Sequence, residues 1–158
     1  MNFDAAFDLL MGHEGDFSDH RADPGGKTRY GVTEATAREV GYRGDMQELP
    51  LDLAKRIYKS RYWDTIKADE LPENVRYIVF DAAVNSGPKQ AILWLQRAAN
   101  VTADGAIGPK TLQAVAQVDS RNIKSSILGQ RLRMMSTLTN WPAFSRGWSR
   151  RIADLLES

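Results

Sequence analysis

The segment at 13–32 opens with His13-Glu14-Gly15-Asp16-Phe17 and closes with Asp23-Pro24-Gly25-Gly26-Lys27-Thr28-Arg29-Tyr30-Gly31-Val32. The residues before it, 3–11, carry apolar side chains at helical spacing, with Asn2 as an N-cap and Gly12 as a stop residue. This pattern predicts a helix that ends at Gly12 and places Glu14 in the turn just beyond it. The Asp-Pro-Gly-Gly turn reverses the chain direction, so Glu14 and Asp23 are expected to lie on either side of one short loop.

These two carboxylates are expected to differ in charge. A carboxylate at a helix C-terminus faces the negative end of the helix dipole, and partial burial acts in the same direction, so we expect a raised pKa for Glu14. Such a group can act as a general acid near neutral pH. Backbone N–H groups and water in the glycine-rich turn would keep Asp23 ionised. One protonated and one charged carboxyl group are what glycoside hydrolysis uses.

Each part of the pattern also has an ordinary structural explanation. A glutamate after a helix is commonly a solvated surface residue, and Asp-Pro-Gly-Gly is a common turn. His13 and His20 suggest a metal, but the HExxH and Cys/His spacings of metal sites are lacking. The loop at 104–109 lacks the acidic ligands of an EF-hand. We therefore expect no metal and no cofactor.

The quoted motifs resemble those of the glycoside hydrolase family 108 muramidases, which are phage endolysins and prophage lysozymes of the lysozyme-like superfamily. The family pattern runs Glu-Gly-Gly-Tyr, then Asp-Pro-Gly-Gly, then Tyr-Gly-Ile-Thr. This chain departs from it at Asp16, Phe17 and Val32, and none of these changes removes a reacting group.

Downstream segments extend the resemblance over nearly the whole chain. Those similar to the catalytic region are Ile57-Tyr58, Tyr62-Trp63-Asp64 and the stretch 80–87, whereas 95–112 is similar to the C-terminal peptidoglycan-binding region of the family. We therefore predict a catalytic muramidase lobe at 1–86 and a helical, peptidoglycan-binding-like lobe at 87–158, packed on each other as one compact unit.

The resemblance implies an endolysin that hydrolyses the β-1,4 bond between N-acetylmuramic acid and N-acetylglucosamine. Glu14 would protonate the glycosidic oxygen. Asp23 would either activate a water on the opposite face or stabilise the oxocarbenium charge. Thr28 would position the water, because a hydroxyl both donates and accepts hydrogen bonds.

Three further residues are predicted to bind substrate: Tyr30, Tyr62 and Asn85. Tyr62 is a candidate sugar platform, although core packing is the commoner role for the aromatic residues around it. Asn85 follows Asp81 by one turn on a helix that is apolar nearly all round. This pair either forms a structural hydrogen bond or faces a cleft, where Asn85 would bind an acetamido or hydroxyl group.

Hydrophobic periodicity predicts a mainly α fold, with the strand signal confined to a small β-hairpin next to the acidic turn; the resemblance implies a lysozyme-like domain. Further helices are expected at 33–40, 51–63, 74–85, 89–99, 111–118, 121–138 and 144–156, with Trp141-Pro142 ending the 121–138 helix. Arg146, Arg150 and Arg151 lie beside Trp148 on the last one. They indicate either a solvated face with a core tryptophan or contact with an anionic wall polymer or lipid.

Composition indicates which partners and which cellular location to expect. The 158 residues include no cysteine and carry a net charge of +1, so we expect no disulfide framework and no nucleic-acid partner. Acidic residues near the N-terminus argue against a signal peptide, and no apolar run is long enough for a membrane span. We expect a monomer made soluble in the bacterial host cytoplasm, which reaches the peptidoglycan of the periplasm after release through a holin.

Three rival functions stay open at this point. A lytic transglycosylase would use the same acid but close the muramic 6-hydroxyl onto C1. A chitinase-like enzyme would cut a polymer without lactyl ethers or peptides. A non-catalytic wall-binding protein would hold the glycan without cutting it, and replacing Glu14 would then change nothing.

Overall fold

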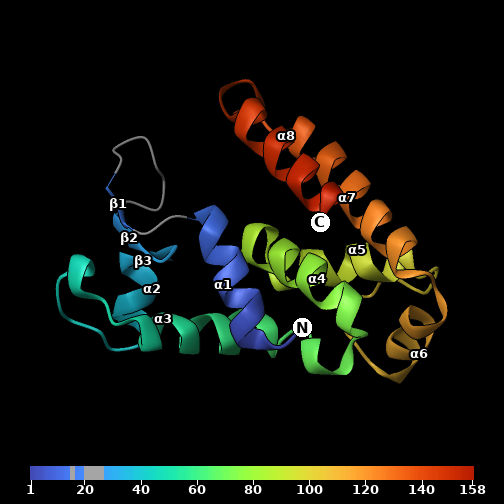
Figure 1. The fold of residues 1–158 in the computed structure, drawn as a ribbon, viewed down its shortest axis with the longest axis horizontal. Helices are drawn as coiled ribbons and strands as arrows, with labels where there is room; N and C mark the ends of the chain where they lie inside the picture. The colour runs from blue at the N-terminus through green and yellow to red at the C-terminus, as the bar shows by residue number, and fades with distance from the viewer. Residues whose placement is uncertain (15–16, 20–26) are drawn as a thin grey trace. The chain divides into compact units, whose positions relative to one another are not determined.

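A computed structural model describes residues 1–14, 17–19 and 27–158, with the backbone alone at 13, 14 and 17–19. The chain divides into two compact units (Figure 1). The N-terminal unit is Phe3–Ser60, and the C-terminal unit is Arg61–Ser158 together with Met1–Asn2. Both consist mainly of helices, which confirms the predicted mainly α class.

Helix α1 (Phe3–Glu14) begins the N-terminal unit and runs through Gly12, so the predicted stop at Gly12 is wrong. A glycine inside a helix costs about 1 kcal/mol relative to alanine, which a well-packed helix tolerates. Ala6, Phe7 and Leu10 supply that packing, because each is almost completely buried. Glu14 is therefore the last residue of the helix rather than a residue of the following turn.

Three short strands follow: β1 (Phe17–Asp19), β2 (Lys27–Arg29) and β3 (Val32–Thr33). They pair antiparallel in the order β1-β2-β3, so the predicted hairpin is present and carries a third strand. Thr33 caps helix α2 (Glu34–Glu39), since its side chain accepts a 3.2 Å hydrogen bond from the backbone N–H of Thr36.

The remaining elements of the N-terminal unit are η1 (Met46–Glu48) and α3 (Leu51–Tyr58). Helix α3 continues into the π-helical turn η2 (Lys59–Trp63), whose last three residues belong to the C-terminal unit. Tyr58 is buried on α3 and packs edge-to-face on Phe7, with ring centroids 5.3 Å apart. Such pairs prefer this geometry, and here the pair joins α3 to α1.

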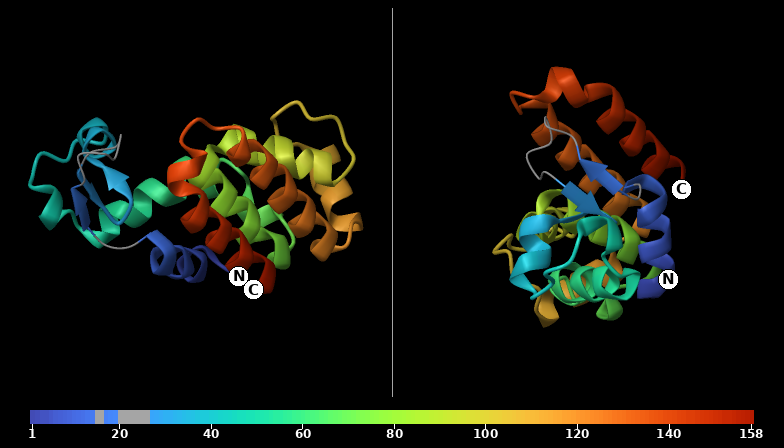
Figure 2. Two further views of the ribbon diagram at one scale, coloured as in Figure 1. Left: turned by 90° about the horizontal axis from the view of Figure 1, so that it is seen from above. Right: turned by 90° about the vertical axis from the view of Figure 1, so that its left-hand side faces the viewer.

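The C-terminal unit consists of η3 (Ala68–Glu70) and five helices, α4 (Glu73–Ser86), α5 (Pro88–Ala98), α6 (Pro109–Gln117), α7 (Ser120–Ser136) and α8 (Trp141–Glu157). Helix α4 packs against α5 and α7, and α7 and α8 lie side by side as an antiparallel pair (Figures 1 and 2). Among the described residues, no helical segment combines the length and hydropathy that a bilayer span requires.

Trp141 and Pro142 begin α8, so the prediction that they end the preceding helix is wrong. Proline is well tolerated in the first turn of a helix, where its missing N–H has no intrahelical partner in any case. The same reason explains Pro88 and Pro109 at the starts of α5 and α6.

A buried glutamine fixes the loop between α5 and α6. The amide nitrogen of Gln96 donates to the carboxylate of Asp104 at 2.8 Å and to the carbonyl of Ala106 at 2.9 Å, and its amide oxygen accepts from the N–H of Gly105 at 2.9 Å. Hydrogen bonds from the Ala106 N–H and from Gln96 hold the pKa of Asp104 below its usual range. The turn at 104–109 is thus a structural element of the unit.

A buried ion-pair group joins three helices of the C-terminal unit. Asp81 on α4 has no exposed surface, and its carboxylate accepts from Arg131 on α7 at 2.5 Å and from Arg151 on α8 at 2.6 Å. Arg131 is 2% exposed, so most of this interaction is shielded from water. A buried carboxylate is stable in such a place because it is fully paired.

We predict that Asp81→Asn lowers the free energy of unfolding by about 3–5 kcal/mol, because it removes the negative charge that pairs with Arg131 and Arg151. Urea denaturation followed by circular dichroism measures this loss. Asp154→Asn, a change at an exposed aspartate of α8, is the matched control and should cost less than about 0.5 kcal/mol. A loss below about 1 kcal/mol for Asp81→Asn would contradict the structural role of this group.

Candidate active site

Glu14 lies at the C-terminal end of helix α1, and strand β1 starts three residues later at Phe17. Glu14 therefore lies at the negative end of the dipole of α1, although the helix continues beyond the predicted stop at Gly12. Asp23, the second predicted catalytic residue, lies outside the described residues. Its predicted role rests on the sequence.

Thr28 occupies the middle of the small sheet. It is half-buried on β2, opposite Ser18 of β1 and Thr33 of β3. A residue on a central strand is held by backbone pairing on both sides, which fixes a reactive or water-binding hydroxyl better than a loop does.

Tyr30 and Gly31 form the two-residue turn between β2 and β3. Both have positive φ angles, 52° and 73°, as the type I′ turns of tight hairpins require. The buried Tyr58 donates its hydroxyl to the carbonyl of Tyr30 at 2.7 Å. Helix α3 thereby fixes the turn that follows Thr28.

Arg29 adds a second restraint on this turn. Its guanidinium lies 4.7 Å from the centre of the Tyr30 ring and donates to the Tyr30 hydroxyl at 3.0 Å and to the carbonyl of Gln47 at 2.8 Å. One face of Tyr30, a predicted substrate-binding residue, is therefore covered by Arg29. The sequence did not predict this role of Arg29, because neither spacing nor periodicity links it to Gln47.

Tyr62 and Asn85, the other two predicted substrate-binding residues, belong to the C-terminal unit. Tyr62 is half-buried in η2, next to Trp63, which is completely buried. The Trp63 ring packs edge-to-face on Phe80 at 5.4 Å, and its indole N–H donates to Asp69 at 3.1 Å. Trp63 thus has the core role that the sequence favoured.

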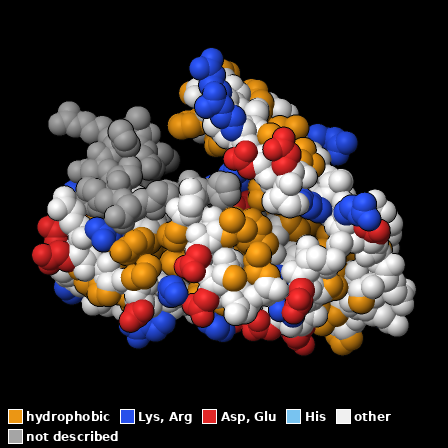
Figure 3. All heavy atoms as spheres, in the orientation of Figure 1, with side chains coloured by type: hydrophobic (Ala, Val, Ile, Leu, Met, Phe, Trp, Pro, Cys, Tyr) orange, Lys and Arg blue, Asp and Glu red, His pale blue; other side chains and the backbone are white. Residues whose placement is uncertain are grey.

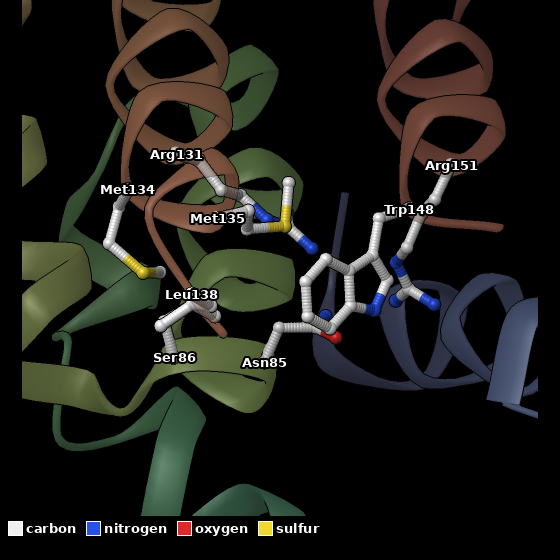
Figure 4. A pocket seen from close by; sticks show the side chains of 8 residues that line it. All are labelled: Asn85, Ser86, Arg131, Met134, Met135, Leu138, Trp148 and Arg151. Atoms are coloured by element: carbon white, nitrogen blue, oxygen red, sulfur yellow. The ribbon is translucent and has the colours of Figure 1, made fainter. Parts of the chain in front are cut away.

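Asn85 is exposed at the end of α4, and its amide donates to the backbone carbonyl of Asp81 at 2.9 Å. It also lines a cavity of about 110 Å³ where α4, α7 and α8 meet (Figure 4). Asn85 therefore makes a structural hydrogen bond, although to the backbone of Asp81 and not to its side chain. Its role in substrate binding stays a prediction.

Ser86, the last residue of α4, also lines this cavity. The other lining side chains come from α7, from α8 and from the loop between them: Arg131, Met134, Met135, Leu138, Trp148 and Arg151. Figure 4 shows Trp148 reaching from α8 toward Asn85, while Arg131 extends from α7 into the same space. The sequence did not predict that Arg131 and Arg151 would point inward to Asp81. The sequence feature that could have predicted these arginines is Asp81, because a carboxylate on an apolar helix requires a cationic partner.

The basic and aromatic cluster of α8 divides into an inner and an outer part. Arg151 points inward to Asp81, whereas Arg146 and Arg150 are exposed. Trp148 is half-buried and stacks on Phe144, with ring centroids 5.4 Å apart. Arginine side chains lie among hydrophobic ones at the end where α7 leads into α8 (Figure 3).

Comparisons with known proteins agree with this architecture. A family model described as Glycosyl hydrolase 108 matches residues 7–87, and one described as Predicted Peptidoglycan domain matches residues 90–153. The solved structure titled "Structure of Brucella abortus SagA" is similar to this chain, with 33% sequence identity and a TM-score of 0.88. The similarity covers 98% of this chain and 91% of that one. No match was found among curated proteins.

The two family matches meet between residues 87 and 90, whereas the compact units divide between Ser60 and Arg61. Helix α4 therefore belongs to the glycosidase match in sequence, although it packs with α5 and α7 in space. The similarity extends over both family regions and nearly the full length of the chain. The chain therefore belongs to the glycosyl hydrolase 108 family, as a peptidoglycan-acting glycoside hydrolase of lysozyme-like fold.

Proposed function

We propose that this protein is an N-acetylmuramidase that hydrolyses the β-1,4 bond between N-acetylmuramic acid and N-acetylglucosamine, with Glu14 as the general acid. The observation that carries the proposal is the position of Glu14 as the last residue of α1, within the 7–87 glycosyl hydrolase match. The negative end of the helix dipole disfavours the ionised carboxylate there. A carboxyl group that keeps its proton can deliver it to the leaving oxygen.

In this mechanism the bond between C1 and the glycosidic oxygen breaks as Glu14 protonates that oxygen, and the sugar develops oxocarbenium character. Asp23 activates a water on the opposite face or stabilises the positive charge. Thr28 positions the water from the middle of the small sheet. The hydrogen bond from Tyr58 to Tyr30 supports this arrangement, because it restrains the turn directly after Thr28 and Arg29.

Substrate binding is assigned to Tyr30, Tyr62 and Asn85. Tyr30 retains one ring face that Arg29 does not cover, and Tyr62 is half-buried, so each has surface to offer a sugar. We further propose that the protein acts as a monomeric phage endolysin, made soluble in the bacterial cytoplasm and released to the periplasmic wall through a holin.

The first experiment digests purified peptidoglycan with wild type, Glu14→Gln and Glu48→Gln, and identifies borohydride-reduced fragments by mass spectrometry. Wild type should release fragments with reduced muramitol ends. Glu14→Gln should be slower by at least about 10²-fold, because the amide cannot donate the proton. Glu48 is exposed in η1, so Glu48→Gln should behave as wild type.

The products separate the rival functions. Anhydro ends would indicate a lytic transglycosylase, and reduced glucosamine ends would indicate a glucosaminidase. Wild type that leaves sacculi intact but binds them would contradict the enzymatic proposal and favour a wall-binding protein. Circular dichroism of both variants checks that the fold is retained.

A second prediction concerns the turn after Thr28. Tyr58→Phe removes the hydrogen bond to the Tyr30 carbonyl, so we expect about 1 kcal/mol of lost stability and a reduction in peptidoglycan hydrolysis by about fivefold or more. Tyr42→Phe is the matched control, because the Tyr42 hydroxyl donates a bond of equal length, 2.7 Å, to the carbonyl of Asp45 in the same unit.

The control should lose similar stability without losing activity, measured as turbidity decrease of a sacculus suspension alongside urea denaturation. Equal activity losses in the two variants would show that the effect is general destabilisation. The turn would then have no special part in positioning Thr28.

A further inference from the structure

Helix α8 carries one apolar stripe, and only the second half of this stripe is buried. Its members recur at intervals of three or four residues and therefore share one face of the helix. They are Trp141, Phe144, Trp148, Ile152 and Leu155. Ile152 and Leu155 are 5% and 2% exposed, so they belong to the core of the C-terminal unit. Phe144 is 45% exposed, and Trp141 and Trp148 are half-buried, so the first half of α8 presents an aromatic surface to solvent.

The three aromatic side chains, Trp141, Phe144 and Trp148, form one aromatic cluster. The Trp148 ring stacks on Phe144 with centroids 5.4 Å apart and an interplanar angle of 18°, and its centroid lies 5.9 Å from that of Trp141. Tryptophan is typical of the boundary between water and lipid, because its ring is apolar while its indole N–H can still reach a polar partner. The composition of the aromatic cluster therefore fits a surface that meets apolar and polar groups together.

Exposed arginines accompany the aromatic cluster. Arg146 and Arg150 alternate with it along α8, and Arg133 lies near the end of α7 that leads into α8. None of the three forms an ion pair with a described residue. Residues 120–153 include no aspartate or glutamate, and the acidic residues of α8 lie in its last turn. The end of the unit where α7 leads into α8 thus combines positive charge with exposed aromatic rings (Figure 3).

We propose that this surface, formed by the aromatic cluster with Arg133, Arg146 and Arg150, binds a bilayer that contains anionic phospholipids. The arginines contact lipid phosphates, and the aromatic rings lie at the boundary between headgroups and acyl chains. A neutral glycan offers faces for the aromatic rings but no charge for three arginines. An anionic wall polymer offers charge but no apolar interior. An anionic bilayer offers both, which decides the choice of partner.

The binding is interfacial. Helix α8 has the features of a helix that lies in the plane of a membrane surface, with tryptophan and phenylalanine on one face and arginines on the others. The surface therefore lies on the bilayer and does not cross it. It contains none of the residues proposed for catalysis, so membrane binding and peptidoglycan hydrolysis are tested separately.

The test measures partition of the full wild-type chain into large unilamellar vesicles by flotation. One set of vesicles consists of phosphatidylcholine alone, and the other contains equal parts of phosphatidylcholine and phosphatidylglycerol. At physiological ionic strength the protein should bind the anionic vesicles at least about tenfold more tightly, because each arginine near an anionic surface adds about fivefold. Brominated lipids should quench the fluorescence of Trp141 and Trp148, whereas Trp63 and Trp94 are buried and should keep theirs.

Substitutions of single arginines locate the electrostatic part of the surface. Arg146→Gln and Arg150→Gln should each weaken binding to the anionic vesicles by about fivefold. Arg56→Gln is the matched control, because it removes the same charge from an exposed position on α3 in the other unit. It should change binding by less than about twofold.

Two substitutions on α8 isolate the apolar part of the surface. Phe144→Gln should weaken binding by about fivefold, since it removes an exposed aromatic ring from the surface. Leu156 is 54% exposed but lies at the opposite end of α8, so Leu156→Gln should bind within about twofold of wild type. Circular dichroism checks that each variant retains its helices.

Equal binding to the two kinds of vesicle, unquenched tryptophan fluorescence in the bound protein, or equal losses in Arg146→Gln and Arg56→Gln would overturn the proposal. A protein that ignores vesicles but binds purified sacculi, and loses that binding in Arg146→Gln, would show that the surface recognises the wall polymer instead. The vesicles contain no glycan, so none of these measurements depends on catalysis. If wild type binds anionic vesicles but does not cut peptidoglycan, the enzymatic proposal falls and the membrane-binding surface stands.

Discussion

The C-terminal unit depends on one buried carboxylate. Asp81 has no exposed surface, so its charge must be balanced inside the protein, and the balance comes from Arg131 on α7 and Arg151 on α8. One side chain on α4 thereby determines how three helices meet. Arg131 and Arg151 also line the cavity at Asn85.

In the N-terminal unit, side-chain contacts restrain the small β-sheet. Its small sheet has few residues, so it depends on neighbouring side chains for rigidity. The buried Tyr58 restrains the Tyr30–Gly31 turn through its hydroxyl, and Arg29 restrains the ring of Tyr30. These contacts hold Thr28 on a defined strand, while α1 ends at Glu14. These contacts therefore restrain short segments of the unit.

Local signals in the sequence predicted most of the helices, because apolar spacing, the Thr33 cap and the prolines act over a few residues. Local rules failed at Gly12 and Trp141: in α1, burial of Phe7 and Leu10 outweighs the cost of a glycine. The charge group of Asp81 could not be predicted, since its arginines lie 50 and 70 residues away in sequence. Glu14 was found by its motif, and its catalytic role stays a prediction together with those of Asp23 and Thr28.

We propose that Glu14 supplies the proton, because the end of α1 favours the protonated form of its carboxyl group. The most direct test is the pH dependence of kcat/KM on soluble glycan strands, which reports the ionisation of groups in the free enzyme. The account predicts that activity falls on the alkaline side with a pKa well above about 4.3, the ordinary value of glutamate. Activity that falls near that value, or an alkaline limb that is unchanged in the residual activity of Glu14→Gln, would contradict it.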